Sequence, residues 1–260
     1  MKKKRVYFTD ELNDEFSRAK IKSKVIDGSY DYFLSSKKSR LCRFIFHRLI
    51  ATPFAFLYAK LRFGRKIVGK EKIKKYRRVG YFFYGNHTHG ILDAFNPGTL
   101  IFPKDGYTVV HPANVSMPIL GRITPYLGAL PLPDDMAAHR SFMATINKRI
   151  AEGQCVIIYP EAHIWPYHTG IRNFPDTSFF YPARLNAPVF CFTNTYHKRF
   201  PFGVKTVTYI DGPFFPDESL NLRERAKKLR DQVHSAMTKR AAESTLTRIE
   251  YVRKEDESLD

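Results

Sequence analysis

Cysteine is scarce in this sequence, and the cysteines that are present form no paired pattern. The 260 residues contain three, Cys42, Cys155 and Cys191, with no CxxC spacing among them. Cys155 and Cys191 lie in the apolar runs CVIIY and VFCFT, so we expect free, buried thiols. This usage excludes a small disulfide-stabilised secreted scaffold and fits a reducing compartment.

Long hydrophobic runs are also missing. The amino-terminal stretch MKKKRVYFTDELNDEF lacks the apolar core of a secretory signal. The best candidate for a membrane span, LIATPFAFLYA at 49–59, would cover only about 16 Å as a helix, against about 30 Å of hydrocarbon. Pro53 is expected to interrupt it. The sequence therefore predicts a cytoplasmic protein without a membrane-spanning helix.

Acidic residues are few in the first third of the chain. Residues 1–80 hold 23 Lys and Arg against 7 Asp and Glu, and the rest is nearly neutral. Within 40–62, basic side chains mix with aliphatic and aromatic ones, which favours a kinked helix pair lying in the membrane interface. The alternative is a helix packed on the domain with its arginines in water. We expect an anionic membrane surface as partner, at the inner face of the cell membrane.

Short apolar runs and helical patterns alternate in the remainder. We predict strands at 79–84, 106–110, 154–159, 188–193 and 204–210, each nearly continuous in apolar residues. Residues 137–152 form an amphipathic pattern closed by Gly153, and Leu222 to Met237 give a second one. The fold class is therefore α/β, with a mixed, mostly parallel sheet flanked by helices and an N-terminal amphipathic helical segment. Residues 1–36 are expected to be a charged, partly helical lead-in.

The stretch YFFYGNHTHGILDAF, 81–95, places ionisable groups at the exit of a predicted strand. Carboxyl ends of strands are where α/β folds usually bind ligands. His87 and His89 with Asp93 are ligands that zinc accepts, and His111, His163 and His168 are available as further ligands. A strand followed by HxH resembles the opening of amidohydrolase-type barrels, so a metal-dependent hydrolase is one interpretation. Against it, the chain is too short for an eight-fold barrel, and no HxxxH or HxxH pair follows.

A metal-free acid/base pair is the second interpretation of this stretch. One imidazole would remove a proton while Asp93 fixes its tautomer. No GxSxG motif is present, so the nucleophile would be a hydroxyl of the substrate. A histidine cluster that is solvated or satisfied within the core is the third interpretation.

Three short blocks stand out along the chain: Asn86-His87-Thr88 followed by Asp93, YPEAH at 159–163, and Ala187-Pro188-Val189. In this order they resemble the NHxSxxD, FPEGT and (V/A)P(I/V) blocks of the PlsC-like family of 1-acylglycerol-3-phosphate acyltransferases. The resemblance covers roughly 79–195. His87 and Asp93 are separated by five residues where the family has four, Ala162-His163 replaces Gly-Thr, and GALPLPDD (128–135) has acids where the family has an arginine.

The resemblance implies a glycerolipid acyltransferase without metal or other cofactor. The donor would be an acyl thioester on coenzyme A or acyl carrier protein, and the acceptor a lysophospholipid. His87 would be the catalytic base, with His89 as the second candidate, and Asp93 its partner. The expected substrate-binding residues are Asn86, His89, Glu161, His163, Arg172 and Arg140. Residues 1–78 would form the membrane-interface lead-in and 79–260 the catalytic domain.

Two alternatives from other classes stay open at this point. A nucleic-acid-binding module would explain the basic first third. It would leave His87, Asp93 and the YPEAH block unexplained, and no RNP1-like or helix-turn-helix pattern is present, so we expect no nucleic-acid partner. The other alternative is a PlsC-like scaffold that binds lipid without catalysis.

Overall fold

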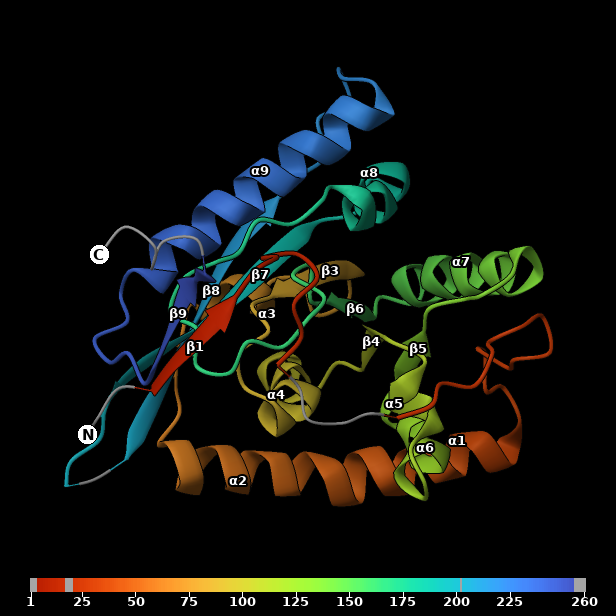
Figure 1. The fold of residues 1–260 in the computed structure, drawn as a ribbon. Coiled ribbons are helices and arrows are strands. Elements are labelled where there is room, and N and C mark those ends of the chain that lie inside the picture. The colour runs from red at the N-terminus through yellow and green to blue at the C-terminus, as the bar shows by residue number, and fades with distance from the viewer. Residues whose placement is uncertain (1–3, 17–20, 202, 255–260) are drawn as a thin grey trace.

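A seven-stranded sheet with helices on both faces organises the chain (Figure 1). The computed structural model describes residues 4–16, 21–201 and 203–254. In chain order the elements are β1 (Lys4–Phe8), α1 (Lys37–Arg43), η1 (Phe44–Ala51), α2 (Thr52–Phe63), β2 (Lys66–Val68), α3 (Lys70–Lys74), β3 (Tyr81–Gly85), α4 (Ile91–Ile101), β4 (Gly106–Val110), α5 (Ala113–Ser116), α6 (Leu120–Ile123), η2 (Thr124–Leu127), β5 (Ala129–Pro131), α7 (Met136–Ala151), β6 (Cys155–Ile158), η3 (Thr177–Phe179), α8 (Phe180–Leu185), β7 (Val189–Lys198), β8 (Val204–Phe214), α9 (Leu222–Ala241) and β9 (Ile249–Arg253).

The main sheet is mixed and mostly parallel, as predicted. Its order is β2-β8-β7-β3-β6-β4-β5, and only β7 and β8 pair antiparallel. The five predicted strands are confirmed as β3, β4, β6, β7 and β8. The sequence did not reveal β2 and β5, which have three residues each. The predicted helices are confirmed as α7 and α9, and Gly153 follows α7 with a positive φ of 74°.

Alternate residues of the central strand β3 face opposite helical layers. Phe82 and Tyr84 pack in the core under α7, α8 and α9. Tyr81 and Phe83 pack on the other side, against α3 and α4. Because both faces are covered, every residue of this strand is buried, which accounts for its unbroken apolar sequence. The parallel strands β3, β6 and β4 place their carboxyl ends at one edge of the sheet.

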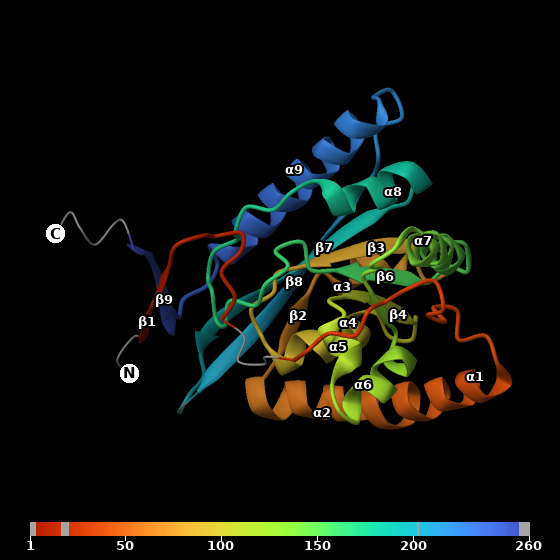
Figure 2. The ribbon, with the colours of Figure 1, turned by 45° about the vertical axis from the view of Figure 1, so that its right-hand side comes forward.

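The first described strand pairs with the last one. β1 lies parallel to β9 in a separate two-stranded sheet, with Lys4 opposite Ile249 and Phe8 opposite Arg253 (Figure 2). From there to residue 36 the described chain is extended or turned, so the expectation of partial helix is wrong for it. Residues 17–20 of this expectation lie outside the described residues. The division of the chain at residue 78 stays a prediction.

One continuous helix, Lys37–Phe63, replaces the expected kinked pair. It has 27 residues and, by length and composition, is long and apolar enough to cross a membrane. Only 11% of its most apolar 18-residue stretch is buried inside the protein. The expectation that no segment is long enough was therefore wrong. The middle part, η1, is π-helical, and Thr52 donates its N–H to the carbonyl of His47. These wider turns directly precede Pro53, so the proline is accommodated instead of ending the helix.

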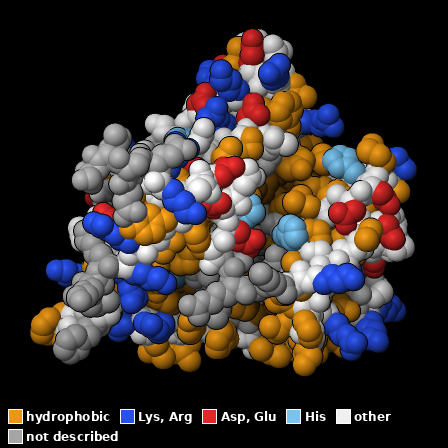
Figure 3. All heavy atoms as spheres, in the orientation of Figure 1, with side chains coloured by type: hydrophobic (Ala, Val, Ile, Leu, Met, Phe, Trp, Pro, Cys, Tyr) orange, Lys and Arg blue, Asp and Glu red, His pale blue; other side chains and the backbone are white. Residues whose placement is uncertain are grey.

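The long helix lies lengthwise along the body of the protein, beneath α4 (Figures 1 and 2). Ala59 and Phe63 on its inner face pack with Leu92 of α4. Its outer face exposes large apolar side chains, namely Leu41, Phe44, Ile45, Leu49, Ile50, Phe54, Leu57 and Leu61. Figure 3 shows hydrophobic side chains along the lower edge, over this helix, with Lys and Arg beside them.

Candidate active site

The exit from β3 is fixed to the neighbouring strand β7. A Cβ atom on Gly85 would lie 2.1 Å from the ring of Phe192, so only glycine allows this close approach. Asn86 then bonds to the main chain of Asn194 in both directions, accepting from its N–H at 2.8 Å and donating to its carbonyl at 3.1 Å. The predicted substrate-binding residue Asn86 thus holds the loop that presents His87.

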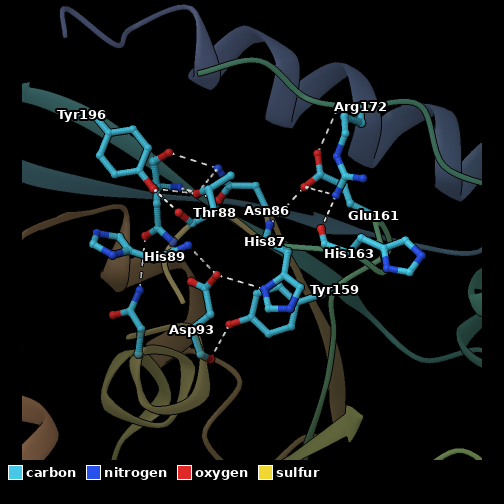
Figure 4. A network of polar contacts seen from close by, with 12 residues as sticks. Asn86, His87, Thr88, His89, Asp93, Tyr159, Glu161, His163, Arg172 and Tyr196 are labelled. Carbon is cyan, nitrogen blue, oxygen red and sulfur yellow. Dashed lines mark hydrogen bonds and ion pairs between the residues drawn. The ribbon is translucent and has the colours of Figure 1, made fainter. Parts of the chain in front are cut away.

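His87 and Asp93 form a hydrogen-bonded pair at this edge of the sheet (Figure 4). Nδ1 of His87 lies 2.9 Å from Oδ2 of Asp93, which also accepts the N–H of His89 at 2.8 Å. Asp93 is 1% exposed in the first turn of α4, where the helix dipole favours a negative charge. Because Asp93 occupies Nδ1, Nε2 is the ring nitrogen that remains for chemistry.

The extra residue between His87 and Asp93 is absorbed before α4 begins. Gly90 has φ 50° and ψ −117°, a conformation that favours glycine, and α4 starts at the next residue. The helix therefore turns Asp93 back towards His87 across five intervening residues.

Tyr159 completes the surroundings of His87. Its ring stacks on the imidazole with a centroid distance of 4.3 Å, and its hydroxyl donates to the main-chain carbonyl of Asp93 at 2.6 Å. Tyr159 was not among the site residues predicted from the sequence. Its signal in the sequence is its place as the first residue of YPEAH, at the end of a predicted strand. In the structure β6 pairs with β3 in parallel, with Ile158 opposite Tyr84, so the next residue lies beside the loop that carries His87.

His89 is directed away from His87 into the protein interior. Its Nε2 lies 3.0 Å from the hydroxyl of Thr206 on β8, and its ring packs edge-on against Phe63 at 4.3 Å. Burial lowers its pKa, so the neutral imidazole is favoured. The two candidates for the base therefore differ: His87 has the carboxylate on its ring, whereas His89 is a buried ring between α2 and β8.

Glu161 joins the loop of His87 to the loop that follows β6. One oxygen accepts the N–H of His87 at 3.0 Å and the other the N–H of Arg172 at 2.9 Å. The Arg172 guanidinium lies 3.7 Å from the carboxylate, donates to the carbonyls of His163 and Glu11, and covers the face of Trp165. Burial raises the pKa of Glu161 and lowers that of Arg172, while their mutual attraction opposes both shifts.

The other predicted substrate-binding residues lie at the surface. His163 is half-buried, with Nδ1 3.9 Å from the Glu15 carboxylate. Arg140 is exposed in α7, and no hydrogen bond or ion pair joins it to the His87 network among the described residues. The substrate contacts of His163, Arg140 and the buried Arg172 stay predictions.

The acids of GALPLPDD accept main-chain hydrogen bonds, two of them from the N-terminal segment. Asp134 accepts the N–H of Ile26 at 2.7 Å. Asp135 caps α7 through the N–H of Ala138 at 2.7 Å and accepts the N–H of Gly28 at 3.2 Å. These two carboxylates therefore hold the extended N-terminal segment around Ile26 and Gly28 against the start of α7, and both already accept hydrogen bonds from the protein.

The imidazoles of His87 and His89 point to different partners and do not converge on one position where a metal ion could bind. His87 faces Asp93 and His89 faces Thr206. Across the described part of the chain, no three His, Cys, Asp or Glu side chains gather in a way that would hold a metal ion.

A buried polar layer beneath the loop was not foreseen. The Thr88 hydroxyl lies 2.6 Å from that of Tyr196, and Asn194 accepts from Asn96 at 3.2 Å and from Thr208 at 2.8 Å. Asn194, Tyr196 and Thr208 belong to β7 and β8 and lie more than a hundred positions from the loop, so no local sequence pattern predicts these contacts. They hold the loop on β7 and β8.

The chain is thus an α/β sandwich with an imidazole–carboxylate pair at the carboxyl edge of its sheet. Neither the protein-family models nor the curated protein sequences give a match. Among solved structures it is similar to the crystal structure of the 1-acyl-sn-glycerophosphate (LPA) acyltransferase PlsC from Thermotoga maritima, with 16% identity, 82% of this chain and 84% of that chain covered, and a TM-score of 0.57. At this identity the similarity shows a shared fold, as the resemblance predicted.

Proposed function

We propose that this protein is an acyltransferase that moves a fatty acyl group from an acyl thioester to a glycerolipid hydroxyl. The observation that carries the proposal is the 2.9 Å contact between Nδ1 of His87 and Asp93, at the carboxyl edge of a sheet with the PlsC fold. Coenzyme A or acyl carrier protein would carry the acyl group, and 1-acylglycerol-3-phosphate is the first acceptor to test.

The reaction follows from the free nitrogen of His87. Nε2 removes the hydroxyl proton of the acceptor as its oxygen attacks the thioester carbonyl, and the tetrahedral intermediate then expels the thiolate, which takes the proton from the imidazolium. Asp93 stabilises the imidazolium and fixes the tautomer with the proton on Nδ1. A positioned base contributes about 10²–10⁴-fold, and holding two substrates together supplies up to about 7–11 kcal/mol more. This scheme uses neither a metal nor an acyl-enzyme.

Residues around His87 are proposed to position this base or to contact the acceptor. Tyr159 and Glu161 hold the base: the first stacks on its ring and the second accepts its main-chain N–H. The half-buried His163 and the exposed Arg140 are proposed to contact the acceptor. Arg172 would act through Glu161, because its guanidinium is buried in the loop.

Membrane association is proposed through the outer face of the long helix. Since its inner face packs along α4, the helix presents its exposed apolar side chains, such as Leu49 and Leu57, parallel to a membrane surface. Insertion to the depth of these side chains brings the protein to its lipid substrate. The inner face of the cell membrane is the proposed location.

The test is thioester consumption by purified protein with long-chain acyl-CoA or acyl carrier protein and lysophosphatidic acid. We expect turnover that survives a chelator and falls about 10²–10⁴-fold in His87→Ala. His89→Ala is the matched comparison, and its activity per folded molecule should fall far less. Turnover that persists in His87→Ala would refute the role of this base, and turnover abolished by the chelator would favour a metal hydrolase. Vesicle binding without turnover on any acceptor would favour a lipid-binding scaffold.

A further inference from the structure

A basic cavity opens at the amino-terminal edge of the main sheet, at the opposite end of β3 from His87. It has a volume of about 850 Å³ and is lined by Tyr81 at the start of β3, by Asp105 and Gln154 just before β4 and β6, and by residues of α3 and the end of α4. This volume lies within the roughly 300–1,000 Å³ typical of small-ligand sites. None of the proposed catalytic groups lines it.

The two acids of this cavity are already neutralised by arginines. Asp105 lies 2.6 Å from Arg48 and 3.5 Å from Arg43. Glu152 is paired with Arg149 at 2.9 Å. Neither carboxylate is left to compensate other cations of the cavity.

Three of the remaining cations that line the cavity have no carboxylate partner. Lys104 is not one of the three free to bind a ligand, because the carbonyls of Tyr76, Val79 and Gly153 already accept its hydrogen bonds. Lys74, Arg77 and Arg78 are exposed, and within the described residues no hydrogen bond or ion pair occupies them.

Lys70 adds a fourth positive charge to this wall. Its ammonium lies 3.5 Å from the carbonyl of Thr99, and no carboxylate of the described chain pairs with it. Burial and the neighbouring cations Arg65 and Lys74 lower its pKa. The concentration of unpaired positive charge around one cavity favours an anionic ligand with several oxygen acceptors, such as a phosphate.

The cavity borders the long helix at Arg48 and at Phe102, which follows α4. Phe102 lines the cavity, is 43% exposed and packs edge-on against Phe56 of α2 at 5.9 Å. Arg48 of the same helix covers the Phe102 ring at 5.4 Å and also lines the cavity. Ile73 and Leu100 add an apolar wall. A ligand with a phosphate and an attached hydrocarbon chain would therefore find both kinds of surface.

We propose that this cavity binds the phosphate headgroup of an anionic membrane phospholipid, with Lys74, Arg77 and Arg78 as its cations. We infer a lipid as the occupant because the cavity borders the helix proposed to contact the bilayer and carries the exposed apolar ring of Phe102 beside its cations. The proposal rests on the membrane contact of the proposed function but needs no acyl transfer. It adds a second lipid site at the edge of the sheet opposite the proposed active site.

The test is vesicle co-sedimentation of the full chain carrying Lys74→Gln, Arg77→Gln and Arg78→Gln together. Phosphatidylcholine vesicles with and without phosphatidylglycerol are compared. We expect the affinity for phosphatidylglycerol vesicles to fall at least about tenfold, because cations near an anionic surface each add to the attraction. Binding to pure phosphatidylcholine, which reports the helix contact separately, should not change.

A matched control removes the same charge from α9, which covers the other face of the sheet. Arg223→Gln, Lys227→Gln and Lys239→Gln neutralise three exposed cations. Affinity should stay within about twofold, because charges beyond a Debye length of about 8 Å are screened. If both triple variants lost the same affinity for phosphatidylglycerol vesicles, the effect would come from net charge alone and the proposed site would be refuted. Loss of inorganic-phosphate binding in the Lys74→Gln, Arg77→Gln, Arg78→Gln variant, with its affinity for phosphatidylglycerol vesicles unchanged, would assign the cavity to a soluble phosphate and overturn the lipid.

Discussion

Replacing Glu161 by glutamine separates a structural role of this carboxylate from a role in substrate binding. The fully buried side chain accepts two main-chain N–H groups, from His87 at 3.0 Å and from Arg172 at 2.9 Å, and faces the Arg172 guanidinium. Glutamine keeps the shape but has one carbonyl oxygen. Its NH₂ group would therefore meet one of the two N–H donors, and Arg172 would lose its counter-charge.

The magnitude follows from these two losses. Leaving a buried donor without an acceptor costs about 1–3 kcal/mol, and removing one partner of a buried ion pair costs about 3–5 kcal/mol. The two overlap, because both arise from the same oxygens, and Arg172 keeps the carbonyls of His163 and Glu11. We therefore expect the free energy of unfolding to fall by about 3–5 kcal/mol, out of about 5–15 kcal/mol for a typical domain.

Urea unfolding measures this change directly. Trp165 is the sole tryptophan and lies over Arg172 at 4.7 Å, so its fluorescence reports on this loop, and circular dichroism reports on the whole chain. With a slope of about 3 kcal/mol per molar urea, the midpoint should fall by about 1–2 M. Glu152→Gln, which breaks the partly exposed pair with Arg149, is the control and should cost less than about 1 kcal/mol. If Glu161→Gln shifted the midpoint no more than this control while turnover fell, the carboxylate would act on substrate and the structural reasoning would fail.

Three further expectations follow from other contacts. Tyr159→Phe should lower the free energy of unfolding by about 1 kcal/mol in urea, since it removes the hydrogen bond to the Asp93 carbonyl but keeps the stack on His87; no change would show that this bond is unimportant. Leu49→Ser with Leu57→Ser should weaken binding to neutral and anionic vesicles alike by at least about tenfold, and unchanged sedimentation would exclude this face as the membrane contact. Burial lowers the pKa of His168 to about 4 from 6.5, so the unfolded chain takes up this proton first, and stability should fall as pH drops from 6.5 to 4. His168→Phe should remove on the order of 2 kcal/mol of that fall at pH 5 in urea titrations, and an identical pH slope in the variant would contradict the assignment.

The main sheet was predictable because its central strands are buried on both faces. A strand such as β3 must be apolar at every position, and this pattern is visible in any single sequence. The edge strands β2 and β5 have three residues each and carry too few positions to show a period. β1 pairs with a segment some 245 positions away, which no local pattern encodes. The long helix was misjudged because only the run 49–59, uncharged between Arg48 and Lys60, was counted as apolar and because Pro53 was expected to interrupt it. The helix in fact extends over Lys37–Phe63, and the π-helical turns of η1 carry the chain past Pro53.

In the candidate site too, contacts between residues close in sequence were predictable and contacts between distant residues were not. The pairing of His87 with Asp93 was predictable, since both lie within one strand–loop–helix unit and Gly90 supplies the turn that absorbs the extra residue. The partner of His89 was not, because Thr206 comes from a strand 117 positions later. Glu161 and Arg172 were both assigned to substrate, yet the fold buries them together. A buried charge is stable only when it is compensated. A buried Glu and Arg eleven residues apart in one loop are therefore better read first as partners of each other, and a substrate role for either then depends on what the Glu161→Gln measurement leaves unexplained.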